Sequence, residues 1–305
     1  MQDPVVRTVD VDGLALAVHE WPHTPPTEGA RGRGLGPVVL IHATGLCARV
    51  WDPVVALLPD TLRVLAIDLR GHGRSDCPEP IEERFRWRQF GEDVAAVLEA
   101  LDLTDVTLVG HSMGGHTATV AALEAPHRVA RLVLFDPTLT PRPKPGDPPR
   151  PPASEQPSRR RRNEWPSPAA FYENLRDRPN FASWSESALR AYTTHGLTPI
   201  DTDGESTAEG GYVLACPPLF EASVYAGNQG ACLDDDLPKI TAAVSVLRAR
   251  PRTPEDPPGL GPSATRLDAL ALFKHLTDRQ HPTAGHFFPQ EDPPLAAQAI
   301  LDAIA

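Results

Sequence analysis

Short apolar runs that alternate with helical patterns constrain the fold more than any other feature of this sequence. The runs are too short for helices and are rich in β-branched residues, as buried parallel strands are. They occupy residues 37–41, 62–67, 106–109, 131–135 and 243–247. Helical patterns lie between them, one with Phe90, Val94 and Leu98 on a single face and another that Pro126 ends. The alternation predicts an α/β fold: a mostly parallel, doubly wound sheet with helices on both faces and ligands at the carboxyl ends of its strands.

A long middle segment, residues 141–234, interrupts this alternation. It opens with a proline-rich stretch, residues 141–152, which can sustain neither helix nor sheet and is predicted to be an extended linker. We therefore predict a core of residues 1–140 and 235–305 and an inserted module between them. Four consecutive arginines, residues 159–162, are interpreted as a solvated helix face or as ion-pairing partners of nearby acids, and they receive no site role.

Aromatic residues are concentrated in this module. They are expected to form a small core for it, and several are expected to line an apolar pocket, as ligand sites are usually lined. Trp184 and Phe220 are our candidates for substrate contacts. This composition favours a substrate with an apolar acyl or aromatic group.

Charge and composition narrow the class of protein. A formal net charge of -11 repels nucleic acid and anionic membranes, and 23% charged with 41% hydrophobic residues suits a globular protein. The N-terminus has no basic stretch followed by an apolar one, and no apolar run is long enough to span a bilayer. The four cysteines form no CxxC pair and have no histidine at metal-ligand spacing. We expect a cytoplasmic enzyme with a small-molecule substrate, reduced cysteines and no cofactor or metal; the oligomeric state stays open.

A candidate nucleophile lies where a strand, a G-x-S-x-G turn and a helix follow one another, at residues 106–115. The glycines permit a turn so tight that the Ser112 hydroxyl projects above the sheet. The N–H of Met113 lies at the helix N-terminus and faces the same space. A plain glycine-rich turn is the alternative, which the preceding strand and the following helix disfavour.

A serine hydroxyl is a poor nucleophile at neutral pH, so it needs a base. We predict His286, which lies in a loop just before the last helical pattern and follows Ser112 in chain order. Attack on a carbonyl also creates an oxyanion, which needs two donors. We assign this role to the backbone N–H groups of Met113 and of Thr44, in the turn after the first buried run. His42 is expected to pin that turn rather than to act as a base.

Four segments, taken in order, resemble the α/β-hydrolase superfamily over nearly the whole chain. They are residues 41–45 (IHATG), 68–76 (DLRGHGRSD), 110–115 (GHSMGG) and 285–287 (GHF). The resemblance implies the α/β-hydrolase fold and identifies the inserted module as the cap that closes over the site and selects the substrate. It also implies that the second segment is a structural turn, so Asp68 and His72 receive no catalytic role.

The acid that orients His286 departs from the superfamily's usual pattern. Similar proteins usually carry it after the last of the apolar strands, where this chain has arginines and a proline. Asp136 directly follows the preceding strand, from which some members supply the acid, and a strand end holds a carboxylate in place. We assign the role to Asp136. Glu255 and Asp256, in a second proline-rich segment, are the alternatives.

These residues predict a serine hydrolase that cleaves a carboxylic ester or lactone. Ser112 would be acylated, and His286 would then assist attack by water. Hydrolysis of a carbon–carbon bond, or perhydrolysis, by the same triad is the alternative within this class. A catalytically inactive member of the fold that only binds a ligand is the alternative from another class.

Overall fold

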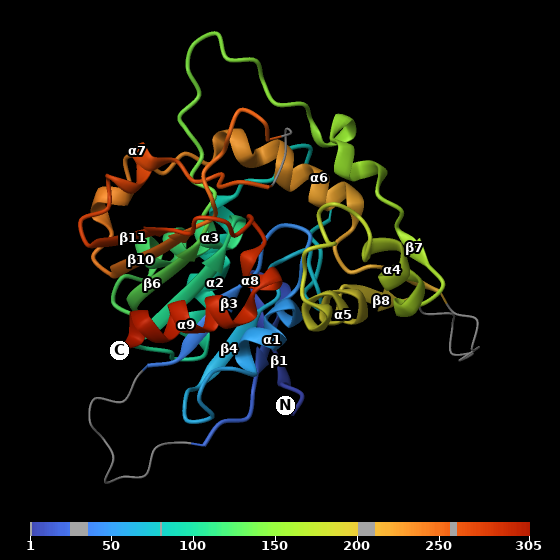
Figure 1. The fold of residues 1–305 in the computed structure, drawn as a ribbon, viewed down its shortest axis with the longest axis horizontal. Coiled ribbons are helices and arrows are strands. Elements are labelled where there is room, and N and C mark those ends of the chain that lie inside the picture. Colours follow the sequence, from blue (N-terminus) through green and yellow to red (C-terminus); the bar gives the residue numbers. More distant parts are fainter. Residues whose placement is uncertain (1, 25–35, 80, 201–210, 257–260) are drawn as a thin grey trace.

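The computed structural model describes residues 2–24, 36–79, 81–200, 211–256 and 261–305. Its main strands are β1 (Val5–Val11), β2 (Leu14–Glu20), β3 (Val38–Ile41), β4 (Val64–Ile67), β5 (Val106–His111), β6 (Val129–Phe135), β10 (Ala243–Arg248) and β11 (Leu276–Gln280). They form an 8-stranded sheet in the order β1-β2-β4-β3-β5-β6-β10-β11 (Figure 1). All neighbours from β4 to β11 pair in parallel, whereas β2 is antiparallel to both β1 and β4. The predicted α/β class and mostly parallel sheet are confirmed.

The N-terminal hairpin and β11 lie at the two edges of the sheet. The N-terminal hairpin turns at Asp12 and Gly13, whose φ values of 52° and 81° are those of the tight turn that an Asp-Gly pair favours. β11 was not predicted because it is an edge strand whose last four residues are polar and exposed, so it has neither an apolar run nor an alternating pattern.

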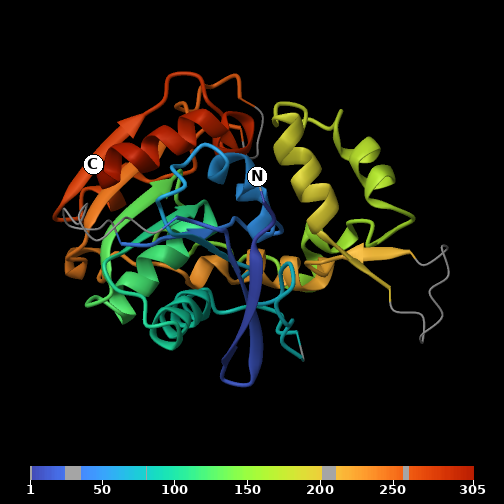
Figure 2. The same cartoon turned by 90° about the horizontal axis from the view of Figure 1, so that it is seen from below.

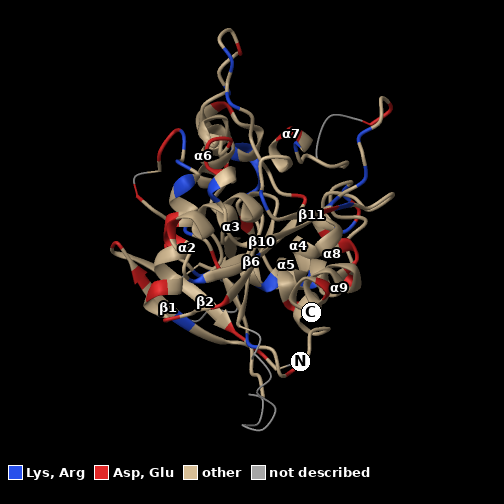
Figure 3. Cartoon of the chain, turned by 90° about the vertical axis from the view of Figure 1, so that its left-hand side faces the viewer, with Lys and Arg blue, Asp and Glu red and all other residues tan. Residues whose placement is uncertain are grey.

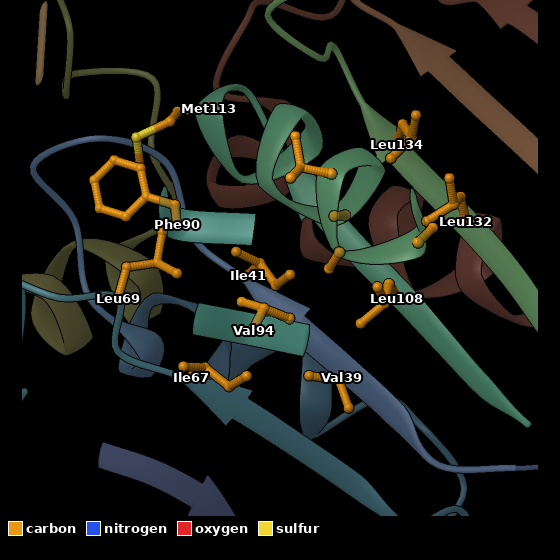
Figure 4. Close-up of a cluster of buried hydrophobic side chains, with 14 of the residues drawn as sticks. Val39, Ile41, Ile67, Leu69, Phe90, Val94, Leu108, Met113, Leu132 and Leu134 are labelled. Carbon is orange, nitrogen blue, oxygen red and sulfur yellow. The ribbon is translucent and has the colours of Figure 1, made fainter. Parts of the chain in front are cut away.

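Helices cover both faces of the sheet. On one face lie α2 (Arg88–Ala100) and α3 (Met113–Glu124), and on the other α1 (Asp52–Val55) and α9 (Pro293–Ile304), as Figure 2 shows. Because side chains alternate along a strand, Leu108 and Leu132 belong to the same buried cluster as Phe90 of α2 (Figure 4), whereas Val109 and Val133 belong to a second cluster with Ile300 of α9. This double coverage leaves the carboxyl ends of the strands as the place for a site.

The predicted insertion has its own small elements. They are η3 (Ala153–Glu155), η4 (Pro157–Arg160), β7 (Glu164–Trp165), α4 (Pro168–Leu175), α5 (Glu186–His195), β8 (Leu197–Pro199), β9 (Tyr212–Leu214), α6 (Pro218–Gly227) and η5 (Asn228–Gly230). The three strands pair antiparallel in the order β7-β9-β8. Figures 1 and 2 place α4 and α5 to one side of the main sheet, whereas α6 packs on the core through Phe220 and Val224. The boundaries at residues 141 and 234 stay a prediction.

Short elements complete the chain: η2 (Ala48–Trp51), η6 (Leu237–Lys239), α7 (Leu267–Leu270) and α8 (Phe288–Glu291). Acidic and basic segments are interspersed over the ribbon rather than gathered on one side (Figure 3). In the part of the chain that the structure describes, no helix has both the length and the apolar character needed to cross a membrane. Among the same residues, no group of three or more His, Cys, Asp and Glu side chains is arranged to hold a metal ion.

Candidate active site

Ser112 lies at a strained turn between β5 and α3. Its φ of 56° and ψ of −117° put a non-glycine residue in a conformation that L-residues rarely adopt. The turn can form only with glycines around it: a Cβ on Gly110 would lie 2.2 Å from the carbonyl oxygen of Gly114, and one on Gly114 would lie 2.4 Å from that of Ile41. The Ser112 side chain remains partly exposed at the carboxyl edge of the sheet.

The structure brings Ser112, His286 and Asp136 together. Asp136 follows β6, the neighbour of β5, so the two parallel strands deliver both residues to the same edge. His286 Nε2 lies 3.0 Å from Ser112 Oγ, and His286 Nδ1 lies 2.6 Å from Asp136 Oδ2. With its Nδ1–H donating to the carboxylate, the imidazole keeps Nε2 free to accept the hydroxyl proton.

Further donors hold the Asp136 carboxylate still. Oδ1 accepts from the N–H of Ala249, at 3.2 Å, and from the Ser263 hydroxyl, while Oδ2 accepts from the N–H of Ala264 at 3.1 Å. Burial alone would raise the pKa of Asp136, but the hydrogen bond and charge of His286, with the Ser263 and Ala264 donors, bring the pKa below its usual value. The buried carboxyl group is therefore ionised at neutral pH.

The alternative acids lie elsewhere. Asp256 Oδ2 accepts from Arg250 Nη1 at 2.9 Å, so this carboxylate is held by a neighbour in its own loop. Glu255 is exposed. Among the described hydrogen bonds, Asp136 is the only one of these three residues whose carboxyl group bonds to His286.

The loop that carries His286 is fixed on both sides. The His286 N–H donates to the carbonyl of Gly261 at 2.8 Å, and its carbonyl accepts from Nε2 of His111, also at 2.8 Å. Burial, and then the nearby His286, lowers the pKa of His111 to about 3. The hydrogen bond to the His286 carbonyl therefore comes from a neutral imidazole. Sequence reasoning missed His111 as a positioning residue. It also missed Thr138, whose Oγ1 lies 3.3 Å from Ser112 Oγ.

The two candidate oxyanion donors are also adjacent. Thr44 Oγ1 donates to Met113 Sδ at 3.2 Å, which ties the turn after β3 to the first residue of α3. The N–H groups in the first turn of a helix have no acceptor within the helix, so that of Met113 suits a ligand oxygen. His42 occupies the pinning position expected of it, because the N–H of Leu69 donates to its Nε2 at 3.1 Å.

A cavity of about 530 Å³ lies beside these residues. Ser112, His286 and Asp136 are not among its lining residues. Thr44 lines it, as does Phe287, whose ring lies 5.2 Å from the His286 ring, centroid to centroid. Leu46, Leu175 and Phe181 add apolar surface, whereas Arg161, Arg178, Asn180, Tyr192 and Glu221 are polar or charged. The wall therefore combines apolar surface with charge.

Neither aromatic residue predicted to contact the substrate, Trp184 or Phe220, lines this cavity, so their role stays a prediction that the cavity does not support. The Trp184 ring packs behind the wall, 5.1 Å from the Phe181 ring and 5.6 Å from the Phe287 ring. Phe220 is fully buried in the core, where it fills the space beside Gly71 in which a Cβ would lie 2.1 Å from its ring. Composition reveals that aromatics gather in the module, but only tertiary packing decides which of them face the cavity.

The four arginines behave differently from one another. Arg159 and Arg160 are exposed, and Arg162 stacks on the Trp165 ring at 4.3 Å. Arg161 instead turns inward and lines the cavity. It also ion-pairs with Glu221, which agrees with the interpretation of the run as partners of nearby acids.

Comparison with known proteins gives the class of this chain. Residues 36–195, more than half of the chain, match the family described as alpha/beta hydrolase fold. The chain therefore belongs to the α/β-hydrolase fold family, as its motifs predicted. A solved structure with the same architecture is that of E-2-(acetamidomethylene)succinate hydrolase, with a TM-score of 0.75, 22% identity and 99% of both chains covered.

Curated relatives match part of the chain. One is 2-(acetamidomethylene)succinate hydrolase of Mesorhizobium japonicum, 31% identical over 133 residues, which covers 43% of this chain and 42% of the relative. Another is 2-hydroxy-6-oxononadienedioate/2-hydroxy-6-oxononatrienedioate hydrolase of Cupriavidus pinatubonensis, 37% identical over 111 residues, covering 34% of this chain and 37% of the relative. The matched region thus spans less than half the length of either relative, and both relatives are hydrolases.

Proposed function

We propose that this protein is a serine hydrolase that cleaves a carboxylic ester or lactone through an acyl-enzyme on Ser112. The observation that carries the proposal is the hydrogen-bonded series from Asp136 Oδ2 to His286 Nδ1, 2.6 Å, and from His286 Nε2 to Ser112 Oγ, 3.0 Å. These are the contacts that general-base activation of a hydroxyl requires. Relatives named as hydrolases support the class of reaction.

The reaction proceeds in two halves. His286 takes the proton of Ser112 as Oγ attacks the carbonyl carbon, and the negative oxygen that results accepts hydrogen bonds from the N–H groups of Thr44 and Met113. His286 then gives the proton to the leaving alkoxide, and the acyl-enzyme forms. Water next attacks the ester carbon with His286 again as base, which releases the acid and restores Ser112. Asp136 stays ionised throughout and stabilises the imidazolium.

A fluorophosphonate tests the nucleophile directly. We expect a covalent adduct on Ser112, located by peptide mass spectrometry, and turnover of some p-nitrophenyl esters or lactones. Ser112→Ala should give no adduct and lower turnover on the order of 10⁶-fold, because triad residues act as a unit. A folded wild-type protein without an adduct would instead favour the ligand-binding alternative, and more than a tenth of the activity in Ser112→Ala would mean that another residue is the nucleophile.

Hydrolysis of a carbon–carbon bond is the second candidate. It uses the same three residues, and the observation that favours it is the 37% identity with the oxononadienedioate hydrolase. An aryl diketone assayed beside the esters separates the two. Faster cleavage of the diketone would reassign the reaction while leaving the roles of Ser112 and His286 unchanged.

A further inference from the structure

The cavity beside the triad has a net positive wall that ester cleavage alone does not explain. Its charged side chains are Arg161, Arg178 and Glu221, two guanidinium groups against one carboxylate. This local excess occurs in a chain whose formal net charge is -11. An acidic protein that repels anions overall thus places cations in one cavity, next to the proposed oxyanion turn.

Arg161 is held rigidly in that wall. It ion-pairs with the buried Glu221, and its Nη2 donates to the Tyr192 hydroxyl at 2.9 Å. Glu221 lies directly against the oxyanion turn, because a Cβ on Gly45 would be 2.8 Å from its Oε1. A buried ion pair is a poor source of stability, since removing both charges from water costs about as much as their attraction returns. The pairing does, however, fix the guanidinium and offset the negative charge of Glu221 beside the place where an oxyanion would form.

Arg178 carries the second positive charge of the cavity wall. Its Nε donates to the carbonyl of Asn174 at 3.0 Å, and no carboxylate among the described residues pairs with it. Asn180 lies in the same part of the wall and offers an amide. A guanidinium presents two parallel N–H donors in the geometry of a carboxylate, so it binds this group better than any other side chain does.

We propose that the cavity binds the carboxylate of an anionic acyl group, with Arg178 as its main partner and Arg161 as the supporting charge. The apolar stem of the acyl group would lie along Leu46, Leu175 and Phe287, which line the same cavity. The substrate class is thus a monoester, or a related acyl derivative, of a dicarboxylic acid. This inference rests on the proposed function, because it takes Ser112 as the acylated residue.

The test compares substrates that differ only in charge. The p-nitrophenyl monoesters of succinate, glutarate and adipate are assayed against their half-amides, in which a carboxamide of the same shape replaces the carboxylate. We expect kcat/KM to favour the carboxylate at the best chain length by roughly 10- to 100-fold, the size of a hydrogen bond to a charged group. In Arg178→Gln this ratio should fall to near one.

Arg176→Gln is the matched control. Arg176 lies two residues away, is half exposed, pairs with Glu173 and Asp177, and is absent from the cavity wall. Its substitution should leave the preference for the carboxylate intact. Equal rates on carboxylate and half-amide in the wild type, or an equal loss of preference in both variants, would overturn the proposal.

Binding of glutarate to Ser112→Ala, measured by calorimetry, separates this inference from the proposed function. If no ester is cleaved but glutarate binds and Arg178→Gln in the same background weakens its binding at least 10-fold, the anion site stands and the proposed chemistry fails. If esters are cleaved without regard to charge and glutarate does not bind, the chemistry stands and the anion site fails.

Discussion

Asp136, the proposed triad acid, follows the strand next to the one that carries Ser112 and lies 2.6 Å from His286 Nδ1. Its φ of 40° turns the chain sharply after β6, and its N–H donates to the carbonyl of Leu247 in β10 at 2.9 Å. The residue directly after β10, Ala249, donates its N–H to the carboxylate instead of supplying a carboxylate itself. Arg248 forms an ion pair with Asp278, in which Nε donates to Oδ1 at 2.8 Å. The two strand ends thus act together on one acid.

Asp136→Asn tests this assignment. The amide keeps the shape of the side chain, but it can donate to His286 Nδ1 and so favour the tautomer in which Nε2 carries the proton. That tautomer cannot accept the proton of Ser112. We expect turnover to fall by up to roughly 10⁴-fold, the loss known for the same change in a serine protease. Ester hydrolysis under saturating substrate measures it, with circular dichroism as the check on folding.

A double variant, Glu255→Gln with Asp256→Asn, is the comparison for that result. These carboxyl groups lie in the neighbouring loop, where Asp256 pairs with Arg250, so turnover should stay near the wild-type value. Collapse of the double variant, together with an active Asp136→Asn, would move the acid to that loop.

At the scale of elements, one helix of the predicted insertion, α5, is hydrogen-bonded to the turn that carries Thr44. Tyr192 of α5 donates from its hydroxyl to the carbonyl of Gly45 at 3.0 Å while accepting from Arg161. Its ring is held by stacking against Phe181, with centroids 5.9 Å apart. The position of α5 therefore bears on the geometry of the proposed oxyanion donor, although Tyr192 touches no reacting atom in the mechanism.

Tyr192→Phe should separate positioning from packing. The ring stays, so the melting temperature should change little. The lost hydrogen bond should lower kcat by roughly 2- to 10-fold while KM for a small acetate ester stays similar. Tyr172→Phe on α4 is the control, because this ring stacks with Arg190 at 4.5 Å and has no contact with Gly45 among the described hydrogen bonds. An unchanged kcat with a lowered melting temperature would show that Tyr192 serves packing alone.

The sequence could predict those parts of the site that depend on residues close together in the chain. Ser112 and Met113 lie within one local motif, and Asp136 follows an apolar strand, so pattern and spacing were enough to select them. Their assembly with His286 then follows from the order of parallel strands. The pairing of Arg161 with Glu221 joins residues 60 positions apart, through packing that no local pattern records.

Across the whole molecule, burial of neutral histidines couples the fold to pH. Burial is the main cause that lowers the pKa of His72, His111 and His116 to about 3 in each case. In an unfolded chain the same groups titrate near pH 6.5. Between those values the unfolded state binds more protons than the native state does, so the free energy of unfolding falls as the pH is lowered through this window.

His116 allows the cleanest test of this coupling. It packs edge-on to the Trp87 ring at 5.2 Å, and neither ring nitrogen has a hydrogen-bond partner among the described residues, so an apolar residue can replace it without breaking a described hydrogen bond. In His116→Leu, the slope of unfolding free energy against pH, from urea denaturation between about pH 4 and 6, should fall by about 1.4 kcal/mol per pH unit, the contribution of one proton. Equal slopes for wild type and His116→Leu would mean that His116 is protonated in the native state across this range, and burial would then not control its charge.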